Sequence, residues 1–167
     1  MKNLLFPILF LPIILFAQCD PVDGCINGEG VYKWESGDRF EGMLTVKAEI
    51  TSMCSHHHQP VKGVAIIGVI PTGEVIGLSK YVRVAQWCAR RGQLQEELCN
   101  QIAREIQKAT DTENVAVYIE ATHGCMEHRG VMAHSSLTQT TVVHGLFHND
   151  AVKSEFFNNV KNQMRHC

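Results

Sequence analysis

Two short segments of this chain carry side chains of the kinds that bind transition metals. Cys54, His56, His57 and His58 lie within five successive positions, and His123-Gly124-Cys125 adds a thiol and an imidazole far along the chain. Two sulfur ligands, one nitrogen ligand and an open fourth position would make a catalytic zinc site, because structural zinc sites are usually closed by four protein ligands. By residue type alone, a surface histidine cluster and packing cysteines are the commoner explanation.

The overall charge narrows the range of partners. The formal net charge is -2 and the sequence pI is about 6.5, so the chain has no global basic field. Nucleic acid is therefore a poor candidate partner, and an anionic substrate would have to be met by a local cluster of Lys and Arg. With 45% hydrophobic and 19% charged residues, the composition is that of a globular domain with one core.

The elements that must position these groups follow from the apolar periodicity. Short alternating or apolar runs predict strands at residues 45–52, 64–70, 115–120 and 138–144. A helical region is expected over residues 79–110, with Gly92 as a candidate break and a core stripe at Leu94, Leu98, Ile102 and Ile106. A closing helix is expected over residues 151–163. The order β-β-α-β-β-α predicts an α+β domain.

Residues 1–18 resemble an export leader. Lys2 precedes an apolar run from Leu4 to Phe16, which is typical of a signal peptide and too short for a membrane-spanning helix of about 20 residues. We therefore expect a periplasmic or secreted protein, with membrane contact only through the leader or through lipidation of Cys19. Gln18 disfavours lipidation. The alternative is an uncleaved leader, or a misassigned start, in front of a cytoplasmic enzyme.

Residues 19–45 form a separate segment rich in Gly, Asp and aromatic residues. Strand-type residues at 31–34 and 39–41 flank a turn at 35–38, which predicts a β-hairpin. The spacing over residues 28–42 resembles a single MORN repeat. Such repeats normally occur in arrays, so a structural spacer is favoured over a docking site.

Seven cysteines give no complete disulfide framework, because their number is odd. Cys19 and Cys25 could pair across a short loop in an exported chain. Cys88 and Cys99 fall within the predicted helical region, where buried thiols act as small hydrophobic groups.

From Val46 to its end, the chain resembles the GTP cyclohydrolase I family. The matching blocks, in chain order, are Met53-Cys54-Ser55-His56-His57, Gly77-Leu78-Ser79-Lys80 with Arg83, Arg90-Arg91-Gly92-Gln93-Leu94-Gln95-Glu96, Ala121-Thr122-His123-Gly124-Cys125-Met126 with Arg129-Gly130, and Gly145-Leu146-Phe147 with Glu155-Phe156. Five blocks in the same order favour the metal-site interpretation over the packing one.

The resemblance implies a role for each candidate residue. Zinc would be held by Cys54, His57 and Cys125, and His56 and His123 would be the catalytic imidazoles. Substrate contacts would come from Ser79, Lys80, Arg83 and Arg129 on the triphosphate, and from Gln95 and Glu96 on the purine. The implied reaction is hydrolytic opening of the guanine imidazole ring of GTP at C8 and rearrangement to 7,8-dihydroneopterin triphosphate with release of formate. This is the first step of folate and pterin biosynthesis.

The family fold implied for residues 46–167 is the T-fold. It consists of an antiparallel four-stranded sheet with two helices, assembled as pentamers or decamers into a barrel with active sites between subunits. Ser55 stands where the family usually has Glu, and the family's N-terminal helices have no counterpart before Val46. We therefore expect altered rather than abolished zinc binding.

Two other functions stay open, because GTP is a cytoplasmic metabolite and the leader predicts export. The chain could be an exported, catalytically inactive T-fold protein that binds zinc and a purine or pterin. It could also be a multivalent docking protein in which the T-fold only clusters copies of the hairpin.

Overall fold

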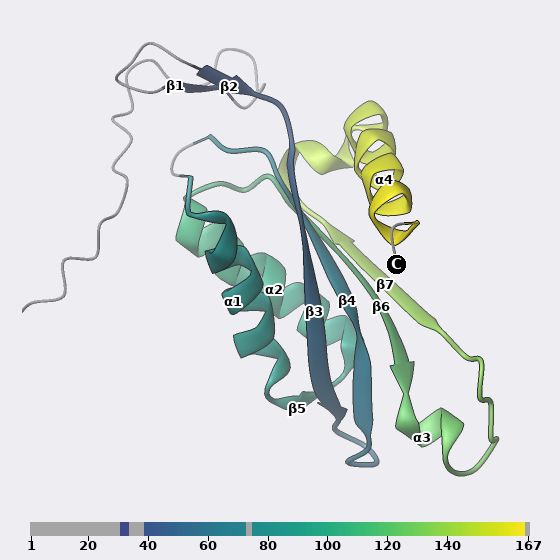
Figure 1. The fold of residues 1–167 in the computed structure, drawn as a ribbon. Coiled ribbons are helices and arrows are strands. Elements are labelled where there is room, and N and C mark those ends of the chain that lie inside the picture. Colours follow the sequence, from purple (N-terminus) through teal and green to yellow (C-terminus); the bar gives the residue numbers. More distant parts are fainter. Residues whose placement is uncertain (1–30, 34–38, 73–74, 166–167) are drawn as a thin grey trace, which may run out of the picture.

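The computed structural model describes residues 31–33, 39–72 and 75–165, and its centre is one strongly twisted sheet (Figure 1). The strands are β3 (Leu44–Cys54), β4 (Pro60–Val69), β5 (Gly92–Gln93), β6 (Val115–His123) and β7 (Thr138–Val143). They lie in the order β5-β3-β4-β6-β7. All neighbours are antiparallel except β5, which pairs with the end of β3 in parallel.

Helices cover both faces of this sheet. Helices α1 (Leu78–Ala89) and α2 (Gln95–Thr110) pack on one face, and α4 (Asp150–Met164) covers part of the other face (Figure 1). The two short elements are α3 (Gly124–Glu127) and the 3-10 helix η1 (Gly145–His148). Successive side chains of β6 point to opposite faces of the sheet, so this strand contributes to the core on each face. Val117 and Ile119 pack in the core under α1 and α2, and Ala116 and Tyr118 pack in the core under α4.

The predicted α+β class is confirmed, with two differences in detail. The sheet has five strands rather than four, because Gly92 and Gln93 form the short strand β5 between α1 and α2. The expected break of the helical region at Gly92 is therefore confirmed. Leu98, Ile102 and Ile106 are buried, whereas Leu94 is 43% exposed because it precedes the first turn of α2.

The predicted hairpin is present as β1 (Val31–Lys33) and β2 (Arg39–Glu41), paired antiparallel. Three other predictions lie outside the described residues: the turn at residues 35–38, the leader at residues 1–18 and the possible Cys19–Cys25 pair.

Among the helices that the structure describes, none is long and apolar enough to cross a membrane.

A glycine allows the central strands to approach closely just before the site. A Cβ atom added at Gly63 of β4 would collide with the backbone of Glu120 and Ala121 on β6. We expect Gly63→Ala to lower the free energy of unfolding by about 1–3 kcal/mol, the usual cost of overpacking. Gly92→Ala is the control, because its nearest neighbour would be the Met53 carbonyl at 3.9 Å. Equal stability of the two variants in urea unfolding would refute this account.

Candidate metal centre and active site

The turn between β3 and β4 places two of the predicted metal ligands. The Cys54 N–H donates to the Gln59 carbonyl at 2.9 Å, and the His58 N–H donates to the Cys54 carbonyl at 2.9 Å, closing a tight turn. His58 adopts a left-handed conformation with φ of 51°. The turn brings the His57 ring back toward Cys54, with Nδ1 at 4.0 Å from Sγ.

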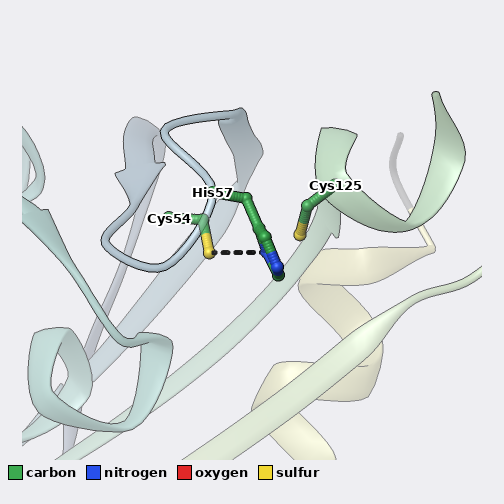
Figure 2. A group of neighbouring side chains, drawn as sticks. All are labelled: Cys54, His57 and Cys125. Carbon is green, nitrogen blue, oxygen red and sulfur yellow. Dashed lines mark hydrogen bonds between the residues drawn. The ribbon is translucent and has the colours of Figure 1, made fainter. Parts of the chain in front are cut away.

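The third ligand comes from the end of β6. Strand pairing sets Val61 of β4 opposite His123, so the first turn of α3 lies beside the β3–β4 turn. The ligand atoms of Cys54, His57 and Cys125 all lie within 4.8 Å of one another. Figure 2 shows the three side chains converging, with the His57 ring between the two sulfur atoms. The predicted ligand set is thus brought together by segments about 70 residues apart in sequence.

This donor set fits a zinc ion. Two thiol sulfurs and one imidazole nitrogen are characteristic zinc ligands, and three protein ligands leave a coordination position open. In the metal-free chain, burial raises the pKa of Cys125, and the neighbouring Cys54 sulfur raises it further. A bound dication would favour both thiolates instead.

The predicted catalytic residue His123 lies at the same end of the sheet, at the end of β6. Its Nε2 lies 2.8 Å from Oε1 of Gln95, the first residue of α2. Burial lowers the pKa of His123, and the Glu96 carboxylate partly offsets this effect. At neutral pH the ring is therefore mostly uncharged and able to accept a proton.

Gln95 itself is buried, with 5% of its surface exposed. Its amide nitrogen donates to the Thr138 carbonyl at 2.9 Å and to Thr140 Oγ1 at 3.0 Å. Sequence reasoning missed these two threonines. They carry no motif, and only the pairing of β7 with β6 brings them next to α2.

The structure brings most of the predicted site residues together, but not all. His56 is exposed on the β3–β4 turn, with its ring centroid 6.1 Å from that of His57. Glu96 and Arg129 are exposed near His123 and Cys125, close enough to influence the pKa values of those two residues. The purine-side and metal-side residues therefore share one end of the sheet.

The other three predicted triphosphate residues lie elsewhere. The C-terminal end of α1 leads into β5, beside Cys54, whereas Ser79, Lys80 and Arg83 belong to its first half (Figure 1). At 1.5 Å per helical residue they lie roughly 10–16 Å further along the helix axis than Arg90. Lys80 and Arg83 line a groove of about 540 Å³ between α1 and α2. Within one chain they are separate from the metal residues.

The buried cysteines of the helices have a different chemistry from the metal-site thiols. Burial raises the pKa of Cys88 to about 11 and that of Cys99 to about 12, and both are fully buried. Because the thiolate is the reactive form, we expect neither to be alkylated in the folded protein. In zinc-free protein Cys125 should react, and zinc should protect it. Mass-spectrometric mapping tests this, and alkylation of Cys99 at the rate of Cys125 would contradict it.

The chain is similar to known proteins over most of its length. The family model for GTP cyclohydrolase I matches residues 29–161. GTP cyclohydrolase 1 2 of Pseudomonas syringae pv. tomato is 44% identical over 127 residues, covering 75% of this chain and 70% of that protein. GTP cyclohydrolase 1 2 of a Nostoc species is 46% identical over 125 residues, covering 74% and 58%. GTP cyclohydrolase 1 of Dictyostelium discoideum is 41% identical over 137 residues, covering 81% and 58%.

The family match also bears on the N-terminal hairpin. It begins at residue 29, so it includes β1 and β2, whereas the sequence analysis began the family domain at Val46. The comparisons give no support to a MORN repeat. We therefore treat the hairpin as part of the family domain.

Proposed function

Because this chain belongs to the GTP cyclohydrolase I family, we propose that it converts GTP to 7,8-dihydroneopterin triphosphate and formate. The observation that carries the proposal is the convergence of Cys54, His57 and Cys125 within 4.8 Å, with His123 two residues from the last of them. The family is zinc-dependent, and these residues supply the ligands.

The chemistry divides between the metal and the neighbouring side chains. Bound by the three ligands, zinc would act as a Lewis acid that lowers the pKa of a water molecule toward neutrality. It would thereby supply the nucleophile for C8 of the guanine. His123, uncharged at neutral pH, accepts a proton early in the reaction and returns it when the ring bond breaks. His56, exposed on the turn that carries His57, is the second imidazole within reach of the site.

Glu96, at the start of α2, recognises the hydrogen-bonding edge of the guanine base. Its carboxylate is exposed and lies near His123. A carboxylate accepts two hydrogen bonds at once, which matches the N1–H and 2-amino donors of guanine. Adenine has no such donor pair, so the site favours GTP over ATP.

The separation of Ser79, Lys80 and Arg83 from the metal residues supports an active site shared between copies of the chain. Arg129, close to Cys125, can meet the triphosphate from the metal-bearing copy, and the α1 residues of a second copy supply the remaining cations. Strand β3 is bordered by β5 only at Met53 and Cys54, and β7 is the last strand on the opposite side of the sheet. Two open edges suit pairing of β3 with β7 of the next copy in a closed ring, as in a pentamer or decamer.

Product analysis tests the proposed activity directly. Zinc-loaded full-length protein is incubated with GTP and, separately, with ATP, and the products are identified by mass spectrometry. We expect formate and dihydroneopterin triphosphate in equal amounts from GTP alone. A folded, zinc-containing protein that binds GTP without releasing formate would instead favour the inactive binding protein.

A further inference from the structure

The groove between α1 and α2 gathers positive charge in a chain whose net charge is negative. Its volume is about 540 Å³, and its lining includes Lys80 and Arg83 from α1 and Lys108 and Glu105 from α2. Three cations outnumber one carboxylate in this lining, whereas the whole chain has a formal net charge of -2. Cations gathered in a hollow attract anions more strongly than the same charges spread over a surface.

The directions of the two helices explain why these cations meet. Helix α1 ends and α2 begins beside β5, so the two helices run side by side in opposite directions (Figure 1). The first half of α1 therefore lies beside the last turn of α2, which carries Lys108. Lys80 and Arg83 are three positions apart, so they share one face of α1, and this face borders the groove.

The contacts of Lys108 leave it able to bind an anion. Its Nζ lies 2.9 Å from Oε1 of Glu105, three positions earlier, and 71% of the lysine side chain is exposed. Exposed ion pairs of this kind contribute little stability, because water screens them. Lys108 can therefore exchange the Glu105 carboxylate for a phosphate, whereas the carboxylate repels a phosphate that enters the groove.

We propose that Lys108 is a further cation for the triphosphate of GTP, and that Glu105 lowers the affinity of the groove for it. This inference rests on the proposed function, in which Lys80 and Arg83 of one copy meet the phosphates of a substrate bound at the metal site of another. The triphosphate carries about four negative charges, because a terminal phosphate approaches two. Lys80, Arg83 and Arg129 supply three positive charges, and Lys108 balances the fourth.

Binding of inorganic triphosphate to zinc-loaded, full-length protein tests this assignment without turnover. In isothermal titration calorimetry, we expect Lys108→Gln to raise the Kd roughly 3- to 10-fold, the loss of a charge-assisted hydrogen bond that solvent weakens. Glu105→Gln should lower the Kd, because it removes the repelling charge. A Kd that Lys108→Gln leaves unchanged would overturn the role of Lys108. A Kd that Glu105→Gln leaves unchanged or raises would overturn the role of Glu105.

Lys153→Gln is the matched control for these variants. Lys153 also pairs with an acidic residue three positions earlier, Asp150, but on α4, which covers the opposite face of the sheet (Figure 1). We expect its Kd for inorganic triphosphate to equal that of the wild type. An equal rise of the Kd in Lys153→Gln and Lys108→Gln would mean that only the net charge of the chain matters, which would overturn the proposal.

Kinetics with GTP separate this inference from the proposed function. Lys108→Gln should raise the KM for GTP by a similar factor and change kcat less than about twofold, since the lysine contacts phosphates and not the reacting ring. Binding of guanosine, which has no phosphate, should stay unchanged. Formate release with the same KM in the wild type and Lys108→Gln would refute the role of Lys108 and leave the activity established. Triphosphate binding that depends on Lys108, without formate release from GTP, would refute the activity and leave the anion site of the groove established.

Discussion

The Cys125→Ala protein is expected to purify with little zinc and to release formate from GTP at less than about one hundredth of the wild-type rate. Loss of a group that only supports a metal ligand already costs about 10- to 100-fold, and Cys125 is itself one of three ligands. Zinc is measured by atomic absorption and formate by enzymatic assay. The fold should survive, because Cys125 is only partly buried at the start of α3.

Cys88→Ala is the matched control for this variant. It also removes a thiol, but one that is fully buried in the core and is not among the three ligands. We expect it to lose some stability and to keep its zinc. Full zinc content in Cys125→Ala would exclude the ligand set proposed here, and zinc loss in both variants would point to general unfolding.

A mixture of two inactive variants is expected to regain activity. One variant, Cys125→Ala, lacks a metal ligand, and the other, Lys80→Ala/Arg83→Ala, lacks cations on α1. Since these residues lie apart within one chain, a site that takes its metal residues from one copy and its α1 residues from another can be intact in a mixed oligomer. Co-expressed in equal amounts, the variants should show roughly a quarter of the wild-type rate, as each site draws independently on both kinds of copy.

The control for this experiment is the triple variant Cys125→Ala/Lys80→Ala/Arg83→Ala co-expressed with the wild type. It carries both defects in one chain, so every site to which this chain contributes is inactive. In an equal mixture with the wild type, a shared site therefore predicts about a quarter of the wild-type rate, and a site held within one chain predicts about half. If the two single-defect variants stay inactive in a mixed oligomer of normal size, the shared site is wrong and one chain must hold the whole triphosphate.

Much of the fold could be predicted because apolar periodicity reports burial directly. The strands, the break at Gly92 and the closing helix followed from it, and the structure contains each of them. The strand β5 was missed because its two residues carry no period and form a strand only by pairing with Met53 and Cys54. Leu94 matched the helical spacing but precedes the helix, since spacing alone does not fix where the first turn begins.

The predictions for the site also succeeded in part and failed in part. The metal ligands could be predicted because the blocks around them resemble the GTP cyclohydrolase I family, whereas residue type alone favoured a surface cluster and packing cysteines. The structure brings the three predicted ligands together. The separation of Lys80 and Arg83 from them could not, because it depends on the direction of α1 relative to β3. The burial of Gln95 was also invisible in the sequence, where Gln95, Glu96 and Glu97 look alike as polar residues at a helix start.

Zinc titration of metal-free, full-length protein tests the central claim most directly. Formate release from GTP is followed as zinc is added, with Cys125→Ala measured in parallel. The account predicts that the rate rises in proportion to bound zinc, reaches its maximum at one ion per chain, and stays near zero in Cys125→Ala. Formate release that does not depend on zinc, or its absence from a folded protein with one zinc per chain, would contradict it.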